Sequence, residues 1–170
     1  LDGTKNFASR VPLYGVNIGL ARDGKMICGA IYLPSTDELC FAEFSTGAFL
    51  NGERVHCSEQ KEWDYSYGIS PIRASLKVVR LFEGIAKISK ETAWFSAVGS
   101  PAVSALYMAD GRRDWYISRG SNVWDYAAPS LIMKEAGCVV TNGKGEEWKI
   151  GDKELIVSNQ YLHPRLLEIL

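Results

Sequence analysis

Short apolar stretches separated by turn residues dominate the first third of the chain. Between residues 14 and 56 the stretches YGVNIGLA, MICGAIYL and LCFAEF are separated by RDGK, PSTDE and STG. An Asp-Gly pair at 23–24 and an Asn-Gly pair at 51–52 mark two corners, and such pairs readily adopt the backbone of hairpin turns. The pattern predicts an antiparallel β-meander of about four strands.

The period of the pattern changes after a polar stretch at residues 58–64. The strands YSYGIS, AWFSAVG, WYISRG, CVVTN and ELIVSN alternate from there with helical segments, which predicts an α/β second half. A helix is expected over residues 73–90, and LHPRLLEIL is expected to close the chain as another. The first of these helices has apolar residues near one face, namely Leu76, Val79, Leu81, Phe82, Ile85, Ala86 and Ile88.

Two further helices carry boundary signals. Ser100 is placed to cap the first of them, Pro101 occupies its first position, and Gly111 follows its end. The second is expected over residues 122–137. Pro129 lies inside it and lacks the N–H of a helical residue, so a kink or an early first turn is expected there.

These elements predict a mixed α/β (α+β) fold built in layers. An antiparallel meander subdomain is expected over residues 1–60, and an alternating α/β subdomain over residues 61–170. The boundary between them is soft, because it rests only on the polar stretch.

Composition narrows the classes of partner. Nineteen Lys and Arg against twenty Asp and Glu leave a formal charge of -1 without a run of one sign, so neither nucleic acid nor an anionic membrane surface is expected as a partner. Apolar runs stay far below the roughly 20 residues of a membrane helix. The four cysteines form no C-x-x-C pair, which favours reduced core thiols in a cytoplasmic protein over a disulfide framework.

Two junctions could hold an anion. LDGT at residues 1–4 and VGSP at residues 98–101 each place backbone N–H groups at the start of a helix or turn, where partial positive charge favours phosphate. Gly and Ser also make ordinary turns and caps. For VGSP alone the ordinary interpretation is preferred.

Asp2 and Asp125 are the strongest candidate carboxylates. Mg²⁺ prefers oxygen ligands and often takes one or two protein carboxylates together with phosphate oxygens of the substrate. Taken singly, each aspartate has a simpler interpretation: Asp2 as a turn residue, and Asp125 as a first-turn charge that complements the helix dipole. His56 and His163 lack metal-ligand spacing and are expected at the surface.

The motifs together resemble one family. LDGTKNF, GAFLNGERV, VGSPAVSALYMADGRRDWY and WDYAAPSLIMKEAG, in that order, look like the inositol monophosphatase family, the Mg²⁺-dependent sugar-phosphate phosphatases. The likeness extends over essentially the whole chain. It implies a phosphomonoesterase that acts on a small polyol or sugar phosphate.

The resemblance also implies roles for the first four residues. The carbonyl of Leu1 would bind one metal ion, and the carboxylate of Asp2 would bind two. Gly3 and Thr4 would hold phosphate through their backbone N–H groups. The Thr4 hydroxyl would orient or activate the attacking water.

Further roles fall in the second half. Asp125 would bind the second metal ion and lie near the substrate hydroxyl. Some members carry a glutamate that contacts inositol where this chain has Ser118 followed by Arg119, so Arg119 could suit a second anionic group of the substrate. The loop that borders the substrate ring would comprise Gly99, Ser100 and Pro101.

Roughly 80 residues precede this point in the family, and they include a Glu and an Asp that complete the metal site. A missing N-terminal segment is therefore expected, as is a homodimer. An incomplete phosphate- or metal-binding half, whose role is assembly with a partner, is the alternative that is not an enzyme.

A haloacid-dehalogenase-like phosphatase is another alternative, because that class has an Asp-x-Asp-Gly-Thr start that LDGT could end. The class also calls for a later acidic G-D-x-x-x-D pattern. Here Gly151-Asp152 is followed four residues later by Ile156, which places this alternative well behind.

Overall fold

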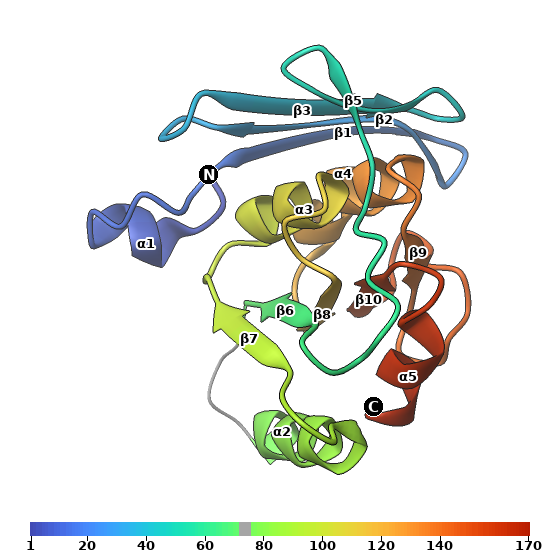
Figure 1. Ribbon diagram of the computed structural model, residues 1–170. Helices are drawn as coiled ribbons and strands as arrows, with labels where there is room; N and C mark the ends of the chain where they lie inside the picture. The colour runs from blue at the N-terminus through green and yellow to red at the C-terminus, as the bar shows by residue number, and fades with distance from the viewer. Residues whose placement is uncertain (72–75) are drawn as a thin grey trace.

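The computed structural model describes residues 1–71 and 76–170 and shows four layers. In Figure 1 the first sheet lies at the top, helices α3 and α4 lie beneath it, the second sheet follows, and α2 and α5 form the last layer. This arrangement confirms the expected mixed α/β class.

The first sheet is an antiparallel meander whose strands are neighbours in the order β1-β2-β3-β4-β5. Five strands are found where about four were expected, because the chain pairs once more after the Asn-Gly corner. The strands are β1 (Val16–Arg22), β2 (Lys25–Leu33), β3 (Glu38–Glu43), β4 (Gly47–Leu50) and β5 (Glu53–Val55).

The second sheet has the order β7-β6-β8-β10-β9. Strand β6 pairs in parallel with β7 and β8, whereas β10 pairs in antiparallel with β8 and β9. Its strands are β6 (Tyr67–Ser70), β7 (Trp94–Ala97), β8 (Trp115–Arg119), β9 (Val139–Thr141) and β10 (Glu154–Ser158). The helices of the protein are α1 (Thr4–Ala8), α2 (Leu76–Ile88), α3 (Pro101–Ala109), α4 (Val123–Glu135) and α5 (His163–Glu168).

Helix boundaries follow the sequence signals closely. Ser100 caps α3, Pro101 is its first residue, and Gly111 follows its end with a positive φ of 77°. Helix α4 continues through Pro129, so an early first turn is excluded there. Residues 72–75, which include the expected start of α2, lie outside the described residues.

Two apolar clusters hold the layers together. The larger joins the first sheet, α3, α4 and the second sheet, and so draws residues from both sides of the expected 1–60 and 61–170 division. The smaller lies between the second sheet and helices α2 and α5. Leu81 and Ile85 belong to it, whereas Val79 and Phe82 of the same predicted face are exposed, because that face is wider than the contact.

The outer face of the first sheet is apolar and exposed. Ile18 and Leu20 of β1 are 68% and 56% exposed, and Leu39 and Phe41 of β3 add to the same surface. A contiguous exposed apolar area of this kind is unusual on the surface of a folded monomer. No helix in the described part of the chain is long and apolar enough to cross a membrane.

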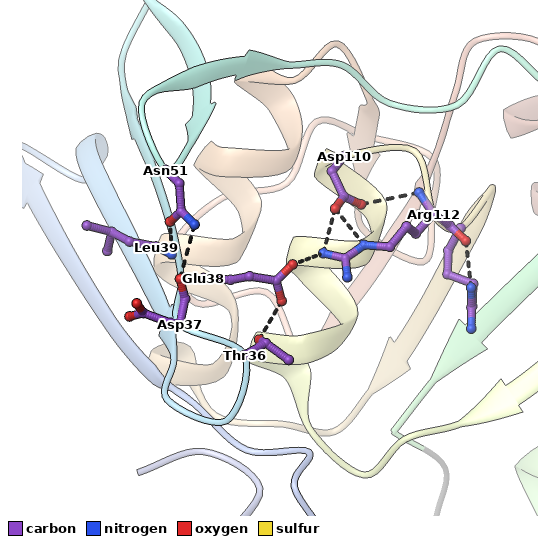
Figure 2. A network of polar contacts seen from close by, with 8 residues as sticks. Thr36, Asp37, Glu38, Leu39, Asn51, Asp110 and Arg112 are labelled. Carbon is purple, nitrogen blue, oxygen red and sulfur yellow. Dashed lines mark hydrogen bonds and ion pairs between the residues drawn. The ribbon is translucent and has the colours of Figure 1, made fainter.

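A polar network fastens the β2–β3 turn to the end of α3 (Figure 2). The Arg112 guanidinium donates to Glu38 Oε1 at 2.7 Å and to Asp110 Oδ2 at 2.6 Å. Thr36 donates to the other oxygen of Glu38, also at 2.6 Å. The first sheet and α3 are thereby tied by charge as well as by apolar contact.

His163 was expected at the surface, and that prediction is wrong. Its side chain is only 6% exposed, at the start of α5. Nε2 lies 3.0 Å from Thr141 Oγ1, and Nδ1 lies 3.0 Å from Ser158 Oγ. Burial lowers its pKa to about 4, so the ring is neutral in the folded protein near neutral pH.

Candidate metal and phosphate site

The opening LDGT turn is held by backbone pairing. The N–H of Asp2 donates to Gly15 O at 2.8 Å, and the N–H of Gly15 donates to Asp2 O at 3.1 Å. Gly3 then turns into α1 with a φ of 77°. A Cβ at Gly3 would lie 2.8 Å from Leu13 O and 3.1 Å from Ser100 Cβ, so only glycine fits here.

The carboxylate of Asp2 lies at the N-terminus of α3. Its Oδ2 accepts a hydrogen bond from the Ser100 hydroxyl at 2.5 Å and another from the N–H of Ala102 at 2.6 Å. Ser100 Oγ in turn accepts from Val103 N at 3.3 Å. Asp2 of LDGT and Ser100 of VGSP, 98 positions apart, therefore form one structure in which a negative charge lies at the positive end of a helix.

Asn6 fixes the same junction from the other side. Its Nδ2 donates to Leu13 O and to Val98 O, each at 2.7 Å. Gly99, with a φ of 66°, passes so close that a Cβ there would lie 3.3 Å from Asn6 Nδ2. The sequence analysis did not single out Asn6, although it belongs to the LDGTKNF stretch and its amide is suited to bridge two carbonyls.

Asp125 lies in the first turn of α4 and is half-buried. The N–H of Asn122 donates to its Oδ2 at 3.1 Å. The helix approaches β2 closely, because a Cβ at Gly29 would lie 3.0 Å from Ala128 Cα. The small residues on both elements thus determine how near α4, with Asp125, comes to the first sheet.

The charges of Asp2 and Asp125 interact electrostatically. The pKa of Asp2 is raised, first by burial, against the hydrogen bonds from Ser100 and Ala102 that lower it, and the charge of Asp125 raises it further. The pKa of the buried Tyr116 phenol is raised well above its usual value, mainly by burial, and both carboxylates contribute. The negative charge of Asp125 thus acts on Asp2, and a cation near both carboxylates would relieve this repulsion.

This donor set fits part of a metal site. Two carboxylates with free oxygens suit Mg²⁺, which takes its remaining ligands from water and phosphate. Within residues 1–71 and 76–170, no group of three or more His, Cys, Asp and Glu side chains is placed to hold a metal ion. The residues present would thus contribute to a Mg²⁺ site without enclosing the ion.

The remaining predicted residues differ in position. Thr4 is exposed at the start of α1, and Leu1 is 61% exposed beside it. Pro101 is buried in α3. These three lie in the segments that meet at Asp2.

Arg119 is not brought together with them. Its Nε lies 3.5 Å from Glu154 Oε1, its neighbour across the β8–β10 ladder. Ser118 points to the other face of β8, where its hydroxyl lies 3.0 Å from the Tyr126 hydroxyl. A substrate contact by Arg119 therefore stays a prediction that this geometry does not favour.

A groove of about 560 Å³ lies elsewhere, between the β1–β2 turn, α4 and residues 147–150. Lys25, Lys134 and Trp148 are among the residues that line it, and the predicted site residues are not.

The layered fold agrees with the comparisons. The chain is similar to a solved structure of the extragenic suppressor protein suhB from Bartonella henselae, with a TM-score of 0.91 and 28% identity over 99% of this chain and 65% of that one. A Thermotoga maritima IMPase structure matches with a TM-score of 0.87 and 30% identity, over 99% of this chain and 65% of that one. The fold is thus that of the inositol monophosphatases.

The family model described as the inositol monophosphatase family matches residues 1–170, and the chain belongs to that family. Among curated relatives, the fructose-1,6-bisphosphatase/inositol-1-monophosphatase of Thermotoga maritima is 32% identical over 99% of this chain. The Nus factor SuhB of Escherichia coli is 33% identical over 85% of this chain and 55% of its own length. The haloacid-dehalogenase-like alternative is therefore not retained.

The chain spans about 64% of the length of the Thermotoga maritima relative and of the inositol-1-monophosphatase of Mesorhizobium japonicum.

Proposed function

We propose that the protein is a Mg²⁺-dependent phosphomonoesterase that hydrolyses a small polyol or sugar phosphate. The observation that carries the proposal is the hydrogen-bonded junction of Asp2 with the N-terminus of α3, together with the charge of Asp125, which raises the pKa of Asp2. Membership of the family and the printed activities of the relatives from Thermotoga maritima and Mesorhizobium japonicum support it.

The residues of this chain would have separate roles in binding the metal, the phosphate and the attacking water. Asp2 and Asp125 would hold Mg²⁺ through their carboxylates, and the Leu1 carbonyl would add one oxygen. Bound Mg²⁺ would lower the pKa of an attacking water and stabilise charge on the leaving alkoxide. The N–H groups of Gly3 and Thr4 would orient the phosphate, and the Thr4 hydroxyl would position the water.

The substrate ring would lie along the loop formed by Gly99, Ser100 and Pro101. That loop is rigid, because Asn6 holds Val98 and Ser100 holds Asp2. A rigid border beside the reacting phosphate is suited to select among polyols. Fructose bisphosphate, inositol phosphates, histidinol phosphate and phosphoadenosine nucleotides remain candidate substrates.

A phosphate-release assay tests the proposal. The chain is assayed with a panel of phosphate esters over a Mg²⁺ titration, both alone and joined to the N-terminal segment of the Thermotoga maritima relative. We expect turnover that requires Mg²⁺ and that falls at least about a hundredfold in Asp125→Asn, which changes charge without changing volume. Equal rates in the variant at limiting Mg²⁺ would remove Asp125 from the site.

A second candidate function is a phosphate- or metal-binding half that assembles with a partner. The exposed apolar face of the first sheet, with Ile18 and Leu20, favours it. Folded protein without turnover in either form of the assay would support this second function. Sedimentation equilibrium would test the homodimer that we also propose.

A further inference from the structure

Cys57 and Cys138 are far apart in the sequence but lie near each other at the C-terminal end of α4. Cys57 follows β5 in the segment that crosses to the second sheet, and Cys138 lies between the end of α4 and the start of β9. The N–H of Cys57 donates to Ala136 O at 2.8 Å. A Cβ placed at Gly137, the residue before Cys138, would lie 3.8 Å from Cys57 Sγ, and each of the two thiols shifts the pKa of the other.

The two thiols differ in access. Cys57 is half-buried, whereas Cys138 is buried with 6% exposure. The Cys138 thiol also donates to Met108 O at 4.0 Å, which limits its movement. An accessible thiol backed by a second thiol is the arrangement of a reacting and a resolving cysteine.

Their acidities differ in the same sense. The hydrogen bond from Cys138 lowers the pKa of Cys57, against the effect of burial. The same hydrogen bond, together with burial, raises the pKa of Cys138 well above its usual value. Cys57 is therefore the sulfur with more thiolate character, and Cys138 keeps the proton.

The other cysteines provide the contrast. Cys40 is fully buried in β3, where burial raises its pKa to about 12. Cys28 is half-buried, as Cys57 is, but it lies in strand β2 of the first sheet. Exposure alone would make Cys28 and Cys57 react alike.

We propose that Cys57 and Cys138 form a peroxide-sensitive dithiol that closes to a disulfide. The Cys57 thiolate attacks a peroxide oxygen and breaks the O–O bond, so that hydrogen peroxide yields a sulfenic acid and hydroxide. Cys138 then attacks the Cys57 sulfur, the S–S bond forms and the S–O bond breaks. The departing hydroxide takes the Cys138 proton and leaves as water, so one peroxide oxidises two thiols.

The disulfide would join two parts of the fold that matter to the proposed site. It would tie the segment after the first sheet to the C-terminal end of α4, whose first turn carries Asp125. A bond between residues this distant in the sequence restricts the unfolded chain strongly. Oxidation would therefore raise the melting temperature and limit movement of α4 against the first sheet.

Peptide mapping of the reduced protein after addition of less than one equivalent of hydrogen peroxide tests the proposal. We expect the Cys57 and Cys138 peptides to appear linked, and we expect dithiothreitol to separate them. In Cys138→Ser the reaction should stop at a sulfenic acid on Cys57 that dimedone traps. In the matched control Cys28→Ser the linked peptide should form at the unchanged rate.

Other outcomes would overturn the proposal. These are oxidation of Cys28 before Cys57, accumulation of sulfinic acid on Cys57 in the unmutated protein, or a linked peptide only after denaturation. The mapping of the unmutated protein decides among them even where a variant folds poorly, and melting curves recorded with each variant show which are folded.

Discussion

At the scale of single residues, the candidate site depends on how Asp2 is held. Its backbone pairs with Gly15, its side chain accepts from Ser100 and from Ala102, and the next residue, Gly3, turns with a positive φ. The hydrogen bonds from Ser100 and Ala102 both go to Oδ2, and they orient the carboxylate.

Gly3→Ala tests the tightness of this turn. The new Cβ would lie 2.8 Å from Leu13 O, and the alanine would have to adopt a disfavoured positive φ. We therefore expect a loss of about 3 kcal/mol in the free energy of unfolding. Gly24→Ala is the matched control, since its φ is 75° and nothing lies within 4 Å of its Cβ. That variant should lose about 1 kcal/mol, from the backbone alone.

Urea denaturation of both variants measures the difference. Equal losses would mean that the crowding at Gly3 is relieved at no cost, and would contradict the rigid turn inferred here.

At the scale of elements, α4 positions Asp125 by its close approach to the first sheet. Gly29 faces backbone atoms of Ala128, and Gly19 faces the flexible end of Met26 before it meets Ala128 N. The C-terminal end of α4 is fixed as well, because Glu135 accepts from Ser45 N at 2.8 Å and from Gly47 N at 2.9 Å.

Gly29→Ala should therefore displace α4 more than Gly19→Ala does. We expect a loss of about 2 kcal/mol in unfolding free energy for Gly29→Ala and a smaller loss for Gly19→Ala, because a Cβ at Gly29 would meet three atoms of Ala128 at 3.0–3.2 Å, whereas a Cβ at Gly19 would meet one, Ala128 N at 3.2 Å, once the Met26 end moves aside. Thermal melting followed by circular dichroism compares the two. The reverse order would mean that α4 is not held by contact at Gly29.

Local signals in the sequence predicted elements better than they predicted contacts. Ser100, Pro101 and Gly111 defined α3 because caps and stops act within one turn of a helix. The hydrogen bonds from Asn6 and to Glu135 were missed, since they join residues about 90 positions apart and leave no periodic trace. His163 was misplaced because a lone polar residue near a Pro looks like a surface turn, while its partners Thr141 and Ser158 come from other strands.

At the scale of the whole molecule, the second sheet is shielded on both faces. Helices α3 and α4 cover one face, and α2 and α5 cover the other, as Figure 1 shows. Within the described residues, the first sheet is covered on one face, and β1 exposes Ile18 and Leu20 on the other. Short apolar stretches and turn residues predicted the strands, but not which of the two faces would be covered, because the larger apolar side chains of β1 lie on its exposed face.

Burial of His163 at the start of α5 makes the stability of the whole fold depend on pH. Its pKa is about 4 in the folded protein, against the ordinary histidine value of 6.5, so the unfolded chain binds the proton first as the pH falls. Stability from this group is fully present above pH 6.5 and is lost between pH 6.5 and 4, by at most about 3 kcal/mol.

Urea denaturation at several pH values checks this dependence. In His163→Gln the loss between pH 6.5 and 4 should shrink by that amount, whereas His56→Gln, altered at an exposed position, should keep the slope of the unmutated protein. An unchanged slope in His163→Gln would show that other groups cause it.

Direct measurement of metal binding is the most direct test of the metal site that Asp2 and Asp125 are proposed to share, because it needs no substrate. Mn²⁺, which takes the same oxygen ligands as Mg²⁺, is titrated into the protein and the free ion is followed by electron paramagnetic resonance. We expect Asp2→Asn and Asp125→Asn each to weaken binding at least about tenfold, about 1.4 kcal/mol, and Asp23→Asn in the exposed β1–β2 turn to leave it unchanged. Unaltered Mn²⁺ affinity in both Asp2→Asn and Asp125→Asn would contradict the account.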